Sequence, residues 1–306
     1  MMTEQLQLFF HNVEKIRLYF GSESTPFEKE LALKLTVRNI SFYYEDYEKV
    51  VQQVKAHTKW YSSARVGQTI YHNYYVHFAK TPDQIKHTLH MYKQLTKHFK
   101  RNEQTYLAAM YMKQEADIKR LQALIRELSQ LPSLSYAALK LSTTALLLTR
   151  KNDIATLAQT YERYYETLLA CGYEQVDTTK MSALLLTFGT GIFCDQTNHH
   201  IQLIAQAIRK SNVKLERCHY NSIALLALAK FDTAQFPALY AIHEEICRQL
   251  NIKKYDCNSL LLATQIYTSN EPIGNLPEDE LNFSDMLHID SETTGDDNAN
   301  DEGGGD

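Results

Sequence analysis

The chain has 306 residues and a mass of 35.4 kDa, with 44% hydrophobic and 22% charged residues, so it can bury a substantial core without disulfides or a metal. Its 10 glycines and 6 prolines amount to roughly 5% of the residues against a usual ~12%, which disfavours sandwiches, barrels and parallel sheets because these need many turns. Residues 1–25 lack the basic start and apolar run of a secretory signal, and no stretch approaches the ~20 apolar residues of a membrane span. We therefore expect a cytoplasmic globular protein with reduced cysteines and no membrane association.

Apolar residues recur at helical spacing through most of the chain. Thr25-Pro26 and Thr81-Pro82 each place a capping threonine before a proline at the first helical position, and Asp153 is suited to cap a further helix. Steps of three and four residues predict amphipathic helices. The stripes are Leu121, Leu124, Ile125 and Leu128; Ile201, Ile204, Ala205 and Ile208; and Leu239, Ile242, Ile246 and Leu250.

More uniformly apolar helices lie between these stripes, and they repeat. The run 145–149 resembles 183–187, an offset of 38 residues, and Asn221-Ser222 resembles Asn258-Ser259, an offset of 37. Such a period predicts an all-α fold of stacked helical hairpins, an α-solenoid-like superhelix, over residues 1–268. An irregular helical bundle is the alternative. The expected hairpins pair 62–80 with 82–100, 102–113 with 115–130, 133–150 with 153–171, 178–193 with 195–211, and 217–230 with 233–250, followed by a terminal helix over 256–268.

Three aromatic-rich segments carry a family resemblance. They are residues 38–47 (RNISFYYEDY), residues 60–65 (WYSSAR) and Cys171-Gly172-Tyr173. With them, residues 30–268 resemble a family of Gram-positive, Firmicute-type bacteria called domain of unknown function 4003. The resemblance implies an all-helical bacterial cytoplasmic protein and brings no activity with it.

Basic residues gather after residue 80. Lys86, Lys93, Lys97 and Lys100 follow steps of seven, four and three residues, so they are expected to share one helix face. Aromatic residues between them could stack on bases, which makes nucleic acid a candidate ligand, whereas the plainer interpretation is a solvated lysine face. The histidines nearby are expected to be titratable surface residues. The residues assigned to partner binding are Lys86, Lys93, Lys97, Lys100, Arg101, Tyr92, Trp60 and Arg65, and the histidines are His72, His77, His87, His90 and His98.

One motif hints at an enzyme. His243-Glu244-Glu245-Ile246-Cys247 imitates the zinc motif H-E-x-x-H, with cysteine in place of the second histidine. Because close paired ligands such as C-x-x-C are absent, we interpret His243 as a solvated helix residue and Cys247 as a small buried one. No phosphate-binding loop or nucleophile elbow occurs, so we predict no catalytic residue, no metal and no cofactor.

The C-terminal residues 269–306 are strongly acidic. Residues 270–306 carry 12 acidic residues and no lysine or arginine, which leaves the remainder of the chain at about +8. This composition predicts a disordered tail. Within it, Phe283, Met286, Leu287 and Ile289 could form one apolar face of a docking segment. We expect residues 278–290 to contact the basic residues near Lys86 on the same molecule.

These features favour a non-enzymatic adaptor whose helical-repeat groove binds a protein partner, with the tail acting in cis or recruiting a second protein. The alternative is a nucleic-acid-binding repeat protein regulated by its acidic tail. Salt separates the two, because nucleic-acid affinity falls steeply with ionic strength whereas an apolar groove is less sensitive.

Overall fold

The computed structural model describes residues 3–21, 26–65, 68–134, 140–210, 216–252, 257–269 and 283–287. Within these ranges it has fourteen α-helices, short 3-10 turns and no strand, so the predicted all-α class is confirmed. The helices are α1 (Glu4–Phe20), α2 (Pro26–Thr36), α3 (Tyr44–His57), α4 (Gln68–Phe78), α5 (Gln84–Leu95), α6 (Glu103–Ala109), α7 (Glu115–Ser129), α8 (Leu141–Leu148), α9 (Ile154–Ala170), α10 (Asp177–Thr190), α11 (Asp195–Lys210), α12 (Tyr220–Leu228), α13 (Phe236–Leu250) and α14 (Cys257–Thr268).

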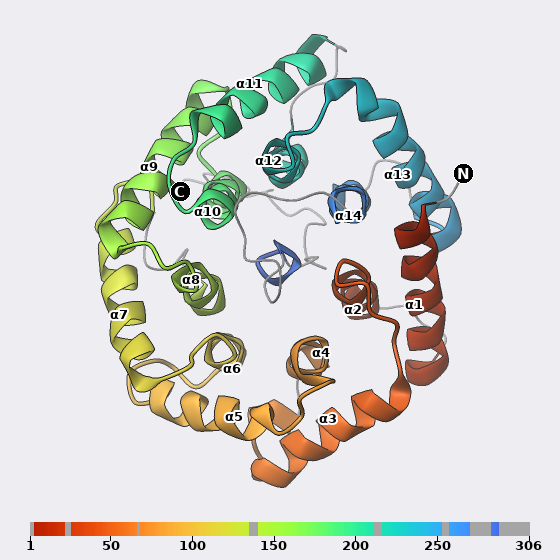
Figure 1. Ribbon diagram of the computed structural model, residues 1–306, viewed down its shortest axis with the longest axis vertical. Coiled ribbons are helices and arrows are strands. Elements are labelled where there is room, and N and C mark those ends of the chain that lie inside the picture. The colour runs from red at the N-terminus through yellow and green to blue at the C-terminus, as the bar shows by residue number, and fades with distance from the viewer. Residues whose placement is uncertain are drawn as a thin grey trace, which may run out of the picture.

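The helices form two concentric rings (Figure 1). The even-numbered helices surround the centre and are seen end-on, and the odd-numbered helices lie along the rim. Each inner helix contacts the next inner helix, and α14 contacts both α2 and α1, so the stack closes on itself. The sequence predicted stacked hairpins but not this closure.

The two rings differ in how their helices are buried. The inner helices α8 and α12 are covered on every side, including their serines and threonines. The rim helix α7 buries one stripe, Ile118, Leu121, Leu124, Ile125 and Leu128, which contains the predicted one. A helix that is apolar all round must be enclosed, whereas an amphipathic helix needs cover on one side only. For these helices, the sequence pattern therefore indicates the ring to which each belongs.

In the structure, the sequence repeat brings corresponding positions of neighbouring inner helices into contact. Hydrogen bonds between them join residues 38 or 39 apart: Lys34 to Asn73, Ser142 to Gln104 and Ser182 to Asn221. The inner helices therefore run parallel, with their C-terminal ends at one mouth of the ring. The predicted pairing of helices is wrong by one helix. Among the inner helices, each rim helix packs most extensively against the one that follows it in the chain, as α1 does with α2 and α9 with α10.

Several helix ends follow the predicted signals. Asp153 caps α9 by accepting a hydrogen bond from the Thr156 amide at 2.9 Å, and Gly191 ends α10 with a φ of 70°. The proline signal at Thr81-Pro82 is misplaced, because α5 begins at Gln84 and Pro82 lies in the preceding turn. Thr25 lies outside the described residues. None of the described helices has the length and apolar character needed to cross a bilayer.

Gly189 provides a test of the packing between α10 and α12. A methyl group added there would lie 2.6 Å from Leu228 Cδ2, a buried atom of the neighbouring inner helix, and 3.1 Å from Phe283 Cζ. An alanine normally stabilises a helix interior by about 1 kcal/mol relative to glycine. We expect Gly189→Ala to lower the free energy of unfolding instead, by about 1–3 kcal/mol in urea denaturation, because the core is already filled.

The control is the same change in a Leu228→Ala background, which opens space beside residue 189. There the added methyl should be neutral or stabilising. A stabilising effect of Gly189→Ala in the wild-type background would contradict this account of the packing.

Candidate functional site

Residues 283–287 occupy the centre of the inner ring. They form the 3-10 turn η5 (Phe283–Asp285), in which the amides of Met286 and Leu287 donate to the Phe283 carbonyl at 3.0 and 3.1 Å. All five residues are buried. The turn is drawn in blue amid the inner helices in Figure 1. We call residues 283–287 the central segment.

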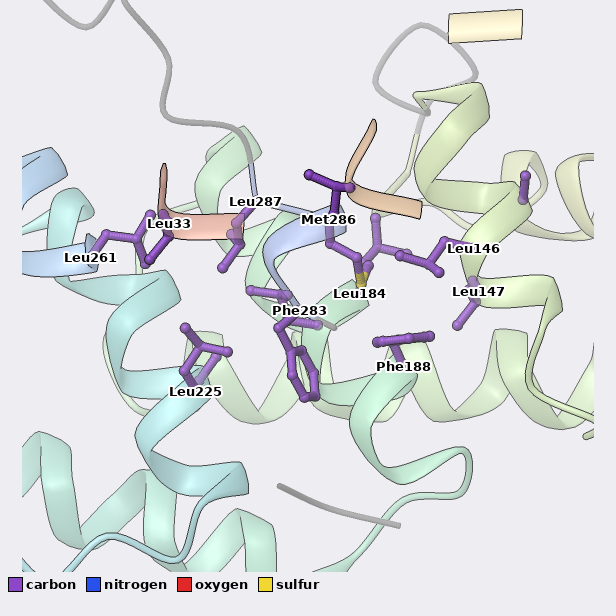
Figure 2. Close-up of a cluster of buried hydrophobic side chains, with 14 of the residues drawn as sticks. Leu33, Leu146, Leu147, Leu184, Phe188, Leu225, Leu261, Phe283, Met286 and Leu287 are labelled. Atoms are coloured by element: carbon purple, nitrogen blue, oxygen red, sulfur yellow. The ribbon is translucent and has the colours of Figure 1, made fainter. Parts of the chain in front are cut away.

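Three apolar side chains anchor the central segment. The ring of Phe283 meets Phe188 of α10 edge-on, with centroids 5.4 Å apart. Figure 2 shows Phe283, Met286 and Leu287 within one apolar cluster that also contains Leu33 and other side chains of the inner helices. Helices from opposite sides of the ring therefore share the segment as a common core.

An ion pair fixes the segment from the side of α2 and α4. Arg38, in the turn after α2, donates from Nη2 to Asp285 Oδ2 at 2.6 Å and from Nη1 to Ser284 Oγ and to the Lys34 carbonyl, both at 3.2 Å. His77, in the last turn of α4, places Nε2 3.3 Å from Asp285 Oδ1. The Asp285 side chain is 0% exposed. Every oxygen of this carboxylate thus faces a nitrogen that can donate.

The titration of these groups follows from burial and charge. Burial favours protonation of Asp285, but Arg38 and His77 outweigh it and hold the pKa of its carboxyl well below the usual range. Burial lowers the pKa of His77, although Asp285 opposes the change. The ring of Tyr111, which follows α6, lies edge-on to His77. Burial raises the pKa of the Tyr111 hydroxyl, and the negative charge of Asp285 raises it further. At neutral pH, Asp285 is ionised and Arg38 is its counter-ion.

A second polar group lies one turn deeper between α2 and α4. The ammonium of Lys34 is 2.7 Å from Glu30 Oε1 and donates to Asn73 Oδ1 at 2.8 Å, and its side chain is 1% exposed. Beside it, a cavity of about 10 Å³ is bordered by these residues and His72. Burial lowers the pKa of His72 to about 4. Because Lys34 and Glu30 neutralise each other, Glu30 is not the counter-ion of Arg38, and Asp285 takes that role.

The basic residues predicted to bind a partner are not brought together with the central segment. All of Lys86, Lys93, Lys97, Lys100 and Arg101 are exposed. Helix α5 ends at Leu95, so Lys97 and Lys100 lie in the turns beyond it and the four lysines do not share one helix face. The described part of the tail lies at the ring centre instead of on α5, because its apolar side chains are covered there.

The predicted aromatic and arginine contacts have other roles. Tyr92 is half-buried and stacks on Tyr106 with centroids 3.6 Å apart, so this face of its ring is already covered. The guanidinium of Arg65 donates to Thr58 Oγ1 at 3.1 Å and to the carbonyls of Lys55 and Thr58, which places it at the C-terminal end of α3. Trp60 is 80% exposed and touches Tyr61 edge-on.

Three of the histidine predictions are wrong. His72 is buried and His77 is largely buried, because α4 belongs to the inner ring. His243 is also buried, with Nε2 2.9 Å from Ser259 Oγ, although it was expected to be solvated. Cys247 is buried as predicted, and its Sγ lies 3.5 Å from His243 Nε2. In the described parts of the chain, no three His, Cys, Asp or Glu residues are grouped so that they could hold a metal ion.

The tail prediction is answered only in part. A wholly disordered tail does not describe residues 283–287, which form a buried turn. Ile289 and the other residues of 270–306 lie outside the described residues. The sequence singled out Phe283, Met286 and Leu287, but it gave Arg38 and His77 no role at this site, because only the folded ring brings them beside Asp285. One signal was available in the repeat. Asn73 and His77 are four residues apart, as are Lys34 and Arg38, and the two pairs are offset by 39 residues.

The structure thus defines a class, a closed ring of helical hairpins that holds a peptide segment of its own chain at the centre. Residues 12–275 match the family described as protein of unknown function (DUF4003), and the chain belongs to this family. The match extends beyond the expected 30–268 into α1. No curated protein and no solved structure matches the chain.

Removing Arg38 should release the central segment. Arg38→Ala leaves Asp285 buried without its counter-ion, which is strongly unfavourable, so the segment should leave the ring. We expect amide exchange of Phe283–Leu287 to quicken at least about tenfold, measured by mass spectrometry on peptic fragments. Arg248→Ala, which removes an exposed ion pair with Glu245, is the matched control and should leave this exchange unchanged. Unaltered exchange in Arg38→Ala would show that the ion pair does not retain the segment.

His72 should make the fold sensitive to mild acid. Its folded pKa of about 4 lies below the ordinary value near 6.5, so between these values the unfolded chain binds more protons and stability falls as the pH falls. Between about pH 7 and pH 5 this residue should cost about 2 kcal/mol of unfolding free energy. His72→Phe should flatten that part of the pH profile, and His87→Gln, at an exposed position, should not. Equal slopes for the three proteins would contradict the assignment to His72.

Proposed function

We propose that the protein is a non-enzymatic interaction protein that holds a short peptide segment at the centre of its ring and exchanges its own segment for one from a protein partner. The observation that carries the proposal is the burial of Phe283, Asp285 and Leu287 among helices from several repeats. The ring is then the binding site, and the central segment is its resident ligand. This replaces the open groove that the sequence suggested.

The energetics of the segment suit exchange. Burying Phe283, Met286 and Leu287 is worth about 5–9 kcal/mol in all, at about 1.5–3 kcal/mol for each side chain. Ordering the backbone of five residues costs about 5–10 kcal/mol. The terms nearly balance, so the ion pair and the tether decide occupancy. Tethering gives an effective concentration in the millimolar range, which a partner peptide must overcome.

The nucleic-acid alternative has weaker support. The lysines after residue 80 do not form one face, and Tyr92 is stacked on Tyr106. A phosphate backbone would therefore meet separated charges with little aromatic surface between them. We also place the protein in the bacterial cytoplasm, on the family resemblance.

Exchange can be tested with a fluorescent peptide that covers residues 278–290. The full-length Phe283→Ala/Leu287→Ala variant, whose own segment has lost two anchors, should bind this peptide at least about tenfold more tightly than the wild-type protein in fluorescence polarisation. The wild-type site is already occupied in cis, which explains the difference.

The matched control is Asp301→Asn/Glu302→Gln, which removes two tail charges beyond the segment and should bind the peptide like the wild type. Equal binding by the anchor variant and the wild type, or no binding by either, would count against exchange at the ring centre.

A further inference from the structure

We propose that the ring centre contains a carboxylate-specific subsite, so that a partner peptide must supply an acidic residue two positions after an aromatic one and directly before two apolar ones. This inference rests on the proposed function and names the class of partner: a protein segment with the pattern found in Phe283-Ser284-Asp285-Met286-Leu287.

Both oxygens of the Asp285 carboxylate lie against nitrogen atoms of the ring. Its two oxygens face Arg38 Nη2 at 2.6 Å and His77 Nε2 at 3.3 Å, and its side chain is fully buried. A guanidinium can only donate hydrogen bonds, and a neutral imidazole protonated on Nε2 also donates here. An asparagine in place of Asp285 could keep its oxygen toward Arg38, but its amide NH₂ would then face His77 Nε2, which accepts that hydrogen bond only as the other tautomer. Arg38 therefore requires an acceptor, and a carboxylate satisfies both nitrogens without a change of tautomer.

Lys34 and Arg38 differ in their counter-ions. Lys34 is neutralised by Glu30 at 2.7 Å, but Arg38 has Asp285 as its ion-pair partner among the described residues. A neutral occupant would leave the Arg38 side chain, which is only 14% exposed, without a counter-ion. Discrimination by an unpaired, largely buried charge is a strong form of specificity, because the wrong ligand is actively penalised.

The backbone of the turn fixes the spacing of the three apolar anchors. The hydrogen bonds from the Met286 and Leu287 amides to the Phe283 carbonyl fix the turn, so one carboxylate position sets where the three apolar side chains point. Phe283 packs edge-on against Phe188 and passes over Gly189, where a methyl group would lie 3.1 Å from its ring. The glycine thus makes room for an aromatic side chain at the first position. Ser284 Oγ accepts a hydrogen bond from Arg38 Nη1 at 3.2 Å.

The subsite can be tested by chemical rescue in the full-length protein. Asp285→Ala leaves Arg38 and His77 facing a space that a small carboxylate fits. We expect formate to raise the thermal midpoint of this variant saturably, whereas isosteric but neutral formamide should not. The wild type and Arg38→Ala/Asp285→Ala should show no saturable response to formate. Absence of the rescue in folded Asp285→Ala would overturn the carboxylate subsite.

A second measurement separates this inference from the proposed function and does not need Asp285→Ala to fold. The Phe283→Ala/Leu287→Ala protein is titrated with the 278–290 peptide and with the same peptide carrying Asp285→Asn. We expect the asparagine peptide to bind at least about thirtyfold more weakly. Equal binding of the two peptides would overturn the subsite while supporting exchange, and failure of both peptides to bind while formate still rescues Asp285→Ala would overturn exchange while supporting the subsite.

Discussion

The structure depends on one constraint: inner helices such as α8 and α12 are apolar on every side and must be covered on every side. Rim helices cover them from outside, and neighbouring inner helices cover their flanks. The side that faces the ring axis needs a further element, because water on the axis would wet side chains such as Leu184 and Leu225. Phe283, Met286 and Leu287 supply this cover, so the central segment belongs to the core as much as any helix.

Electrostatics then decide where the segment can sit. The inner helices run parallel, so their C-terminal ends, which carry partial negative charge, meet at one mouth of the ring. A carboxylate there would be repelled, but Arg38 bonds both the Lys34 carbonyl near the end of α2 and Asp285. One guanidinium therefore satisfies a helix end and a buried acid together. The site is polar around Asp285 and apolar elsewhere. The apolar contacts supply binding energy, and the few polar contacts fix the position of the bound segment.

The local pattern of the sequence was enough to predict an all-α repeat and the helices from α4 onward, and it singled out three tail residues, Phe283, Met286 and Leu287, that are buried. Stripes such as Leu121–Leu128 report burial directly, and the 38-residue offset reappears as hydrogen bonds between inner helices. Closure was not predictable, because it depends on the small rotation between successive hairpins, and no residue pattern encodes that α14 meets α2. Only the apolar half of the site could be predicted from the sequence. Phe283 stood out in an acidic stretch, whereas Arg38 and His77 gain their meaning only when the ring places them beside Asp285.

Ring closure also bears on how the chain is made. Helix α2 leaves the ribosome among the first, but its last neighbour, α14, is among the final helices to be synthesised. Until then the nascent protein is an open stack with two bare apolar ends and an uncovered axis, a state prone to aggregation and to capture by chaperones. Contacts between such distant parts of the chain also form slowly. The ring therefore closes only once α14 has emerged, and a chain that stops before α14 keeps its apolar ends exposed.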